Sequence, residues 1–176
     1  FENTETTIDL RYPYYWHLAS TPPDPTAGAL FPEATKTNNT EYGMNRALFN
    51  WFSVDNTVFN RSNSQTPEHI RRNKDLQSNH LTREVKEQEL FPNRDAILGQ
   101  SSYLPVLNVS FYPTERGPYN LDLNVNPLTG ELLNPEKRWG GMMRKIETSD
   151  FETANIEYLE FWMMDPFVED STNPGG

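Results

Sequence analysis

The sequence predicts an all-β fold with long loops and at most short helices. Its 14 prolines argue against long helices, because proline lacks the amide hydrogen that a helix interior needs. Hydrophobic residues make up only 35% of the chain, so the core must be thin, yet aromatic residues make up 12%. Large rings bury roughly 150–250 Å² each and can sustain a small sheet-based core. Short strands joined by turns rich in proline and asparagine fit this composition best.

The length of 176 residues suits one domain. The chain opens at Phe1 without an initiator methionine and closes on Asn173-Pro174-Gly175-Gly176, so we interpret both ends as cut points within a longer chain. No run approaches the ~18 consecutive apolar residues of a membrane helix, whereas a single transmembrane β-strand would be harder to recognise. The prediction is one β-rich domain or segment over residues 1–176.

The charge balance disfavours two classes of partner. A net charge of −10 repels the phosphates of nucleic acids and the headgroups of anionic lipids. Cysteine is absent, which excludes disulfides, thiolate nucleophiles and cysteine-ligated metals without indicating a compartment.

In the first half of the chain, the pattern predicts strands over residues 7–10 and 46–54, the second with apolar groups on both faces. A proline-rich loop over 19–42 separates them and is long enough to be either functional or packed against something. Thr66-Pro67-Glu68 can open a short helix. Residues 81–90 fit either a strand or an exposed helix, which Phe91-Pro92 ends.

In the second half, residues 103–112 alternate as a strand, in which Pro105 indicates an edge position or a bulge. A turn over 114–120 and a short strand over 121–125 are expected next. Residues 138–146 form a further strand, whose Gly140-Gly141 pair permits a kink or close backbone approach.

The strongest element is a strand over residues 155–164, interrupted only by Glu157 and Glu160. Both of its faces are apolar, so we expect a central strand of a sheet. Its rings and methionines would then serve cohesion.

Nothing in the sequence indicates catalysis. The histidines His17, His69 and His80 are scattered, and their spacing matches no metal site or catalytic motif. Carboxylate pairs such as Glu157 and Glu160 are expected by chance among 25 acidic residues. We therefore expect no enzyme, no catalytic residue and no cofactor.

A calcium-binding loop is the metal site that the sequence pattern suggests. Asp122, Asn124 and Asn126 occupy alternate positions, as in an EF-hand. The sixth position is Pro127 where glycine is required, and the twelfth is Leu133 where a glutamate is required. Asparagine and aspartate around a proline turn explain the run equally well, so no metal is expected.

An aromatic group near the N-terminus is the candidate contact site, and three interpretations stay open for it. The rings could fill the core, form a protein interface, or stack on a sugar, because aromatic residues are enriched in cores and interface centres alike. The residues concerned are Tyr12, Tyr14, Tyr15 and Trp16.

Several stretches of the chain match one known pattern. The longest runs from Arg138-Trp139-Gly140-Gly141-Met142-Met143 to Glu152 and continues through residues 154–158, 160–162 and 165–167. Shorter ones are Phe1-Glu2 with residues 7–11 and Trp16 with residues 18–22, then residues 87–94 (EQELFPNR) and 112–120 (YPTERGPYN). Together these stretches resemble the SprA/Sov family, the outer-membrane translocon of the type IX secretion system in gliding Bacteroidota. The polar loops at 19–45 and 55–80 do not match beyond those residues.

The resemblance implies that the parent is a giant outer-membrane β-barrel that conducts folded proteins to the cell surface and exports gliding adhesins. It implies a smaller PorV-type outer-membrane barrel, a periplasmic plug protein and secreted cargo as partners. It places this segment on the extracellular or periplasmic side of the outer membrane and carries over no catalytic residue. A structural or gating role in protein transport follows as the expectation.

A fainter similarity concerns the fold. A domain that opens with Phe1-Glu2 and ends in a strand over residues 158–162 is similar to the galactose-binding-like jelly rolls of carbohydrate-binding modules. We therefore expect a jelly-roll-like sandwich, with room for a missing closing strand after residues 165–167. A free carbohydrate-binding module is the alternative function.

Overall fold

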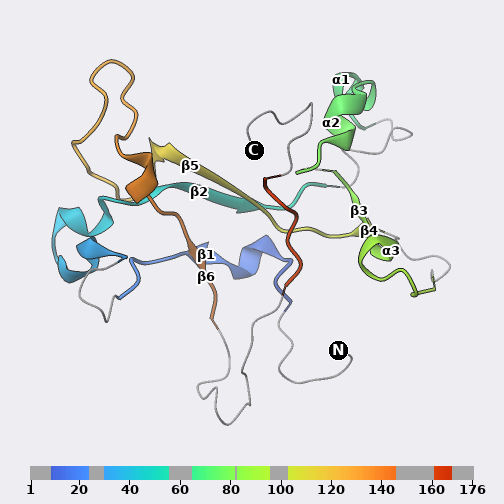
Figure 1. Cartoon of the computed structure of the whole chain (residues 1–176), viewed down its shortest axis with the longest axis horizontal. Helices are drawn as coiled ribbons and strands as arrows, with labels where there is room; N and C mark the ends of the chain where they lie inside the picture. The colour runs from blue at the N-terminus through green and yellow to red at the C-terminus, as the bar shows by residue number, and fades with distance from the viewer. Residues whose placement is uncertain are drawn as a thin grey trace, which may run out of the picture. The chain divides into compact units, whose positions relative to one another are not determined.

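The computed structural model describes residues 9–23, 30–55, 65–81, 83–95, 103–145 and 161–167. The chain divides into two compact units: unit 1 comprises residues 1–11, 53–108 and 148–176, and unit 2 comprises residues 12–52 and 109–147. The described residues form antiparallel strand pairs in small sheets and a few short helices (Figure 1). This confirms a mostly-β fold. The single domain over residues 1–176 stays a prediction.

Unit 2 contains two of the sheets. Strand β1 (His17–Leu18) runs antiparallel to β6 (Met142–Met143), with Leu18 opposite Met142. Strand β2 (Ala47–Phe52) pairs with β5 (Asn108–Arg116), and the two arrows lie side by side in Figure 1. The strand predicted over 46–54 is thereby confirmed. Its predicted burial on both faces is only partly right, because Phe52 is exposed.

Short 3-10 turns connect these strands, and three of the four begin with proline, whose fixed φ suits a first helical position. They are η1 (Pro13–Tyr15), η2 (Pro32–Thr35), η3 (Thr40–Gly43) and η5 (Pro135–Lys137). The loop predicted over 19–42 is packed inward at two of its described residues, Thr21 and Glu33. Thr21 is buried, donates its hydroxyl to the Tyr42 carbonyl at 2.8 Å and accepts the Tyr42 hydroxyl at 3.0 Å.

The core is thin, as composition predicts. Among the described residues, the buried hydrophobic side chains are Ala47, Val85 and Leu132. Twice as many polar or charged residues are buried: Thr21, Glu33, Arg46, Thr66, Asn120 and Arg138. All of these except Thr21 and Thr66 belong to the site described below. Polar contacts therefore carry much of the cohesion that apolar packing carries in an ordinary domain.

Unit 1 contains the α-helices of the described residues. They are α1 (Glu68–Arg71), α2 (Lys74–Ser78) and α3 (Glu87–Leu90), with β3 (Val85–Lys86) antiparallel to β4 (Tyr103–Leu104). The helix predicted to open at Thr66-Pro67-Glu68 is confirmed as α1. It is short because the Asn73 side chain accepts the amides of Asp75 and Leu76 and so caps a second helix. The ambiguous stretch 81–90 contains both a strand and a helix.

Three predicted strands are corrected in the second half of the chain. Residues 103–112 split into β4 and β5 at Pro105, which has no amide to donate to a ladder. Of the strand predicted over 138–146, residues 138–145 are described; they form a strand only at β6, while Trp139 makes a parallel bridge to Arg46. Residues 121–125 contain only a bridge from Val125 to Leu132, because side-chain oxygens of Asn120 and Asp122 take amides that a ladder would need.

The predicted strands near the two ends lie largely outside the described residues. Of the strand expected over 155–164, only residues 161–164 are described; they are not in a strand, and Phe161, Trp162 and Met163 are exposed. Met164 is partly covered, so the expected burial of both faces is not found in the described part of this stretch. Asp9 and Leu10, the described end of the strand expected over 7–10, are also not in a strand.

Candidate functional site

A network of buried polar side chains occupies the centre of unit 2. We call it the polar network, and its members are Glu33, Asn45, Arg46, Asn120, Asp122, Arg138 and Trp139. The residues come from η2, from the start of β2, from the turn after β5 and from the segment before β6. The network therefore ties together segments that lie far apart in the sequence.

Arg138 joins the most segments. Its side chain is only 2% exposed and pairs with the Asp122 carboxylate at 2.7 Å. Its Nη1 donates to the Met44 carbonyl at 2.6 Å, while Nε and Nη2 donate to the Leu133 carbonyl at 3.0 and 2.7 Å. The planar guanidinium can satisfy these acceptors at once, which a lysine could not do.

Arg46 makes a second set of contacts between segments that are distant in the sequence. Its guanidinium donates to the carbonyls of Pro118 at 3.2 Å and Ala19 at 3.0 Å, and lies 5.2 Å from the Trp139 ring centroid. Its own carbonyl accepts the Asn120 side-chain amide at 2.6 Å. Burial lowers the pKa of Arg46, and the nearby Tyr42, Tyr119 and Glu33 oppose that shift. The Nε atom is buried and has no hydrogen-bond partner among the described residues.

Glu33 is fully buried and serves as an acceptor for two donors. Its carboxylate oxygens accept Trp139 Nε1 at 2.6 Å and Asn45 Nδ2 at 2.8 Å. The Trp139 ring also packs edge-on against Phe31, at 5.5 Å between centroids. These contacts fix the Trp139 indole between η2 and β2.

Replacing Glu33 with leucine should lower the free energy of unfolding by about 2–3 kcal/mol, because two buried donors lose their acceptor. Glu33→Gln keeps one acceptor oxygen and should cost less. Urea unfolding followed by tryptophan fluorescence measures both variants. Equal losses for the two substitutions would contradict the assigned role of the carboxylate.

Glycines allow backbones to approach closely around this network. A Cβ on Gly140 would lie 2.5 Å from Phe49 Cβ, and one on Gly43 would lie 2.5 Å from the Tyr119 carbonyl oxygen. A Cβ on Gly141 would meet Ala19 Cβ at 3.2 Å. The close approach predicted for the Gly140-Gly141 pair is found at Gly140, where side-chain atoms of Phe49 and Phe111 leave no room for a Cβ.

Asp122 has a shifted pKa within the network. Burial by itself would raise it, but the Asn124 amide and the Arg138 guanidinium outweigh burial and hold the pKa of Asp122 below its ordinary value of 3.8. A carboxyl with a lowered pKa in the folded state contributes stability above its unfolded pKa and loses it as pH falls through the folded value.

Acidification below pH 3.8 should therefore remove the Asp122 contribution to stability. The expected result is a fall in the free energy of unfolding that is smaller in Asp122→Asn than in the unaltered chain. Urea unfolding curves recorded for both at neutral and acidic pH provide the measurement. Parallel pH profiles for the two chains would show that Asp122 does not contribute.

The run weighed as a calcium loop is engaged in turns. Asp122 Oδ1 accepts the Asn124 amide at 3.0 Å, and Asn126 Oδ1 accepts the Leu128 amide at 2.9 Å. Oδ2 of Asp122 faces Arg138. These bonds confirm the explanation by asparagine and aspartate turns. In the described part of the chain, no three His, Asp or Glu side chains are grouped to hold a metal ion.

The predicted contact residues lie together on η1 and beside it. Tyr12, Tyr14 and Tyr15, which we call the tyrosine cluster, are exposed, while Trp16 is half-buried. The rings of Tyr14 and Tyr15 are 4.3 Å apart with an angle of 47° between their planes, and those of Tyr12 and Tyr15 are nearly perpendicular at 82°. The three rings therefore pack on one another and do not form a flat platform.

The tyrosine cluster is anchored to the rest of unit 2. The Pro13 carbonyl within η1 accepts Trp51 Nε1 from β2 at 3.1 Å. On the other side, the Arg144 guanidinium lies 4.8 Å from the Tyr15 ring centroid, in cation–π geometry. The exposed rings thus have a defined position.

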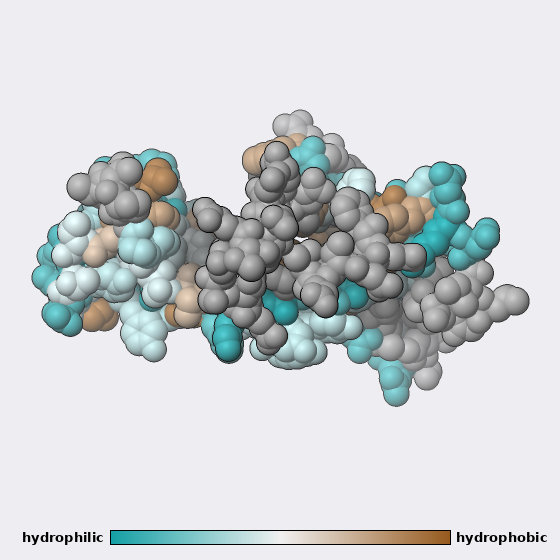
Figure 2. All heavy atoms as spheres, turned by 90° about the horizontal axis from the view of Figure 1, so that it is seen from below, coloured by the Kyte–Doolittle hydropathy of each residue, from teal (hydrophilic) through white to brown (hydrophobic). Residues whose placement is uncertain are grey.

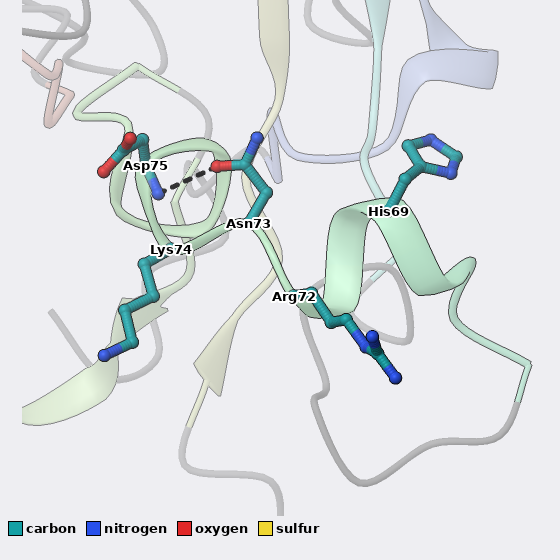
Figure 3. A pocket seen from close by; sticks show the side chains of 5 residues that line it. All are labelled: His69, Arg72, Asn73, Lys74 and Asp75. Carbon is teal, nitrogen blue, oxygen red and sulfur yellow. Dashed lines mark hydrogen bonds between the residues drawn. The ribbon is translucent and has the colours of Figure 1, made fainter.

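The three histidines are divided between the two units. His17 is in β1 in unit 2, while His69 and His80 are in unit 1. His69 lines an open depression at the α1–α2 turn with Arg72, Asn73, Lys74 and Asp75, all exposed. Their side chains point in different directions, and the hydrogen bond drawn joins the Asp75 amide to Asn73 (Figure 3). The depression is the surface where α1 and α2 meet.

Apolar side chains reach the surface among hydrophilic ones (Figure 2). In unit 2 they include residues of β5 and of the segment that follows it: Val109, Phe111, Tyr112, Tyr119, Leu121, Leu123 and Leu128. Among the residues described, no helix has the length and apolarity needed to cross a bilayer.

No family model matches this chain, and no curated protein matches it.

Sequence reasoning found the tyrosine cluster but missed the polar network. A sequence feature could have pointed to Arg138 and Trp139, since they open the longest stretch that resembles the SprA/Sov family. For Arg46 and Asp122 the feature is weaker: each is a charged residue beside an apolar run. No sequence feature points to Glu33, because a glutamate after proline in a polar loop is ordinarily exposed.

Proposed function

We propose that this chain is a non-catalytic structural and gating segment of a protein-conducting outer-membrane translocon of the SprA/Sov kind. The parent would export folded proteins and gliding adhesins, with this segment on the extracellular or periplasmic side of the outer membrane. Its partners would be a PorV-type barrel, a periplasmic plug protein and the cargo. The sequence resemblance supports the identity of the parent, and the use of the matching residues supports the structural role.

The observation that carries the structural role is the engagement of residues 138–143. Arg138 bonds two carbonyls and a carboxylate, Trp139 bonds Glu33, and Met142 and Met143 pair with β1. In a catalytic or ligand site some of these polar groups would face a cleft. Here they are directed to other segments of the same unit, as a scaffold requires.

The finer fold belongs to this proposal as well. A galactose-binding-like jelly roll would join the small sheets into a sandwich, with its closing strand supplied by the rest of the parent. Two-stranded sheets are marginal by themselves, which favours such completion.

Mass spectrometry of the outer-membrane fraction tests the identity of the parent. Peptides from residues 83–94 and 117–137 should come from one very large polypeptide that co-purifies with a smaller barrel protein. A mature polypeptide of about the length of this chain would defeat the proposal. Arg138→Met in the parent should reduce export of folded cargo, while an exposed control, Thr37→Ala, should not.

A carbohydrate-binding module is the second candidate, and the exposed tyrosine cluster favours it. Tyrosine rings can stack on sugars, but the mutual tilt of these rings limits the area they offer to a flat glycan. A glycan array with the unaltered chain and with Tyr14→Ala tests this candidate. Binding lost in the variant would support it, and absence of binding to any glycan would exclude it.

A further inference from the structure

We draw no further inference here: the strongest candidate, the group of exposed apolar side chains in the turns that follow β5 (Tyr119, Leu121 and Leu123), carries nothing, because nothing in the described part of the structure shows what covers it.

Discussion

Replacing Arg138 with methionine is expected to lower the free energy of unfolding of unit 2 by about 3–5 kcal/mol. The substitution leaves the half-buried Asp122 carboxylate without its partner and removes the donors to the carbonyls of Met44 and Leu133. Methionine fills a similar volume, so the loss in the free energy of unfolding comes mainly from the missing polar contacts and less from a cavity. Three of the four tryptophans, Trp16, Trp51 and Trp139, lie in unit 2, so urea unfolding can be followed by fluorescence.

Arg138→Lys is the control for charge. It keeps the cation near Asp122 but cannot reach the acceptors on both sides, so we expect an intermediate loss. The double variant Arg138→Met with Asp122→Leu should recover part of the stability, because no charge is then left buried and unpaired. If Arg138→Met unfolded at the urea concentration of the unaltered chain, the polar network would not be what holds unit 2 together.

Replacing Gly117 with alanine should destabilise unit 2 by about 3 kcal/mol, the upper end of the usual cost of overpacking. A Cβ there would overlap the Ala47 carbonyl oxygen and lie 2.7 Å from the Ala47 carbonyl carbon and 3.0 Å from the Arg46 oxygen. These are backbone atoms at the start of β2, so no side-chain rotation can relieve the overlap. The Gly117 amide also donates to the Arg46 carbonyl at 3.3 Å, which fixes the distance between the segments.

Gly141→Ala provides the comparison for Gly117. Its new Cβ would meet only the Ala19 side chain at 3.2 Å, and a shift of a few tenths of an ångström accommodates it. Thermal unfolding of both variants, followed by circular dichroism, should place Gly117→Ala well below Gly141→Ala. Equal melting temperatures would mean that the turn after β5 moves freely away from β2.

The sequence predicted those elements that are determined by residues close together in the chain. The strand at β2 follows from its apolar alternation, and α1 follows from Pro67 at its start. Pro105 indicated an edge position or a bulge within one strand, whereas the structure has two strands, β4 and β5, on either side of it. The thin core follows from the low hydrophobic fraction. The sequence singled out the residues of the tyrosine cluster as a group, but it predicted neither the short turn that begins at Pro13 nor the tilt of the rings.

Contacts between distant segments were needed for the rest. Residues 121–125 alternate like a strand, but the face that turns inward is chosen by Arg46 and Arg138, which lie 74 residues before Asn120 and 16 residues after Asp122. Glu33 is buried only because Trp139 and Asn45 offer it donors. Composition and periodicity indicate which side chains prefer water on average. Whether a particular charged side chain is buried depends on whether it meets a partner in the folded chain.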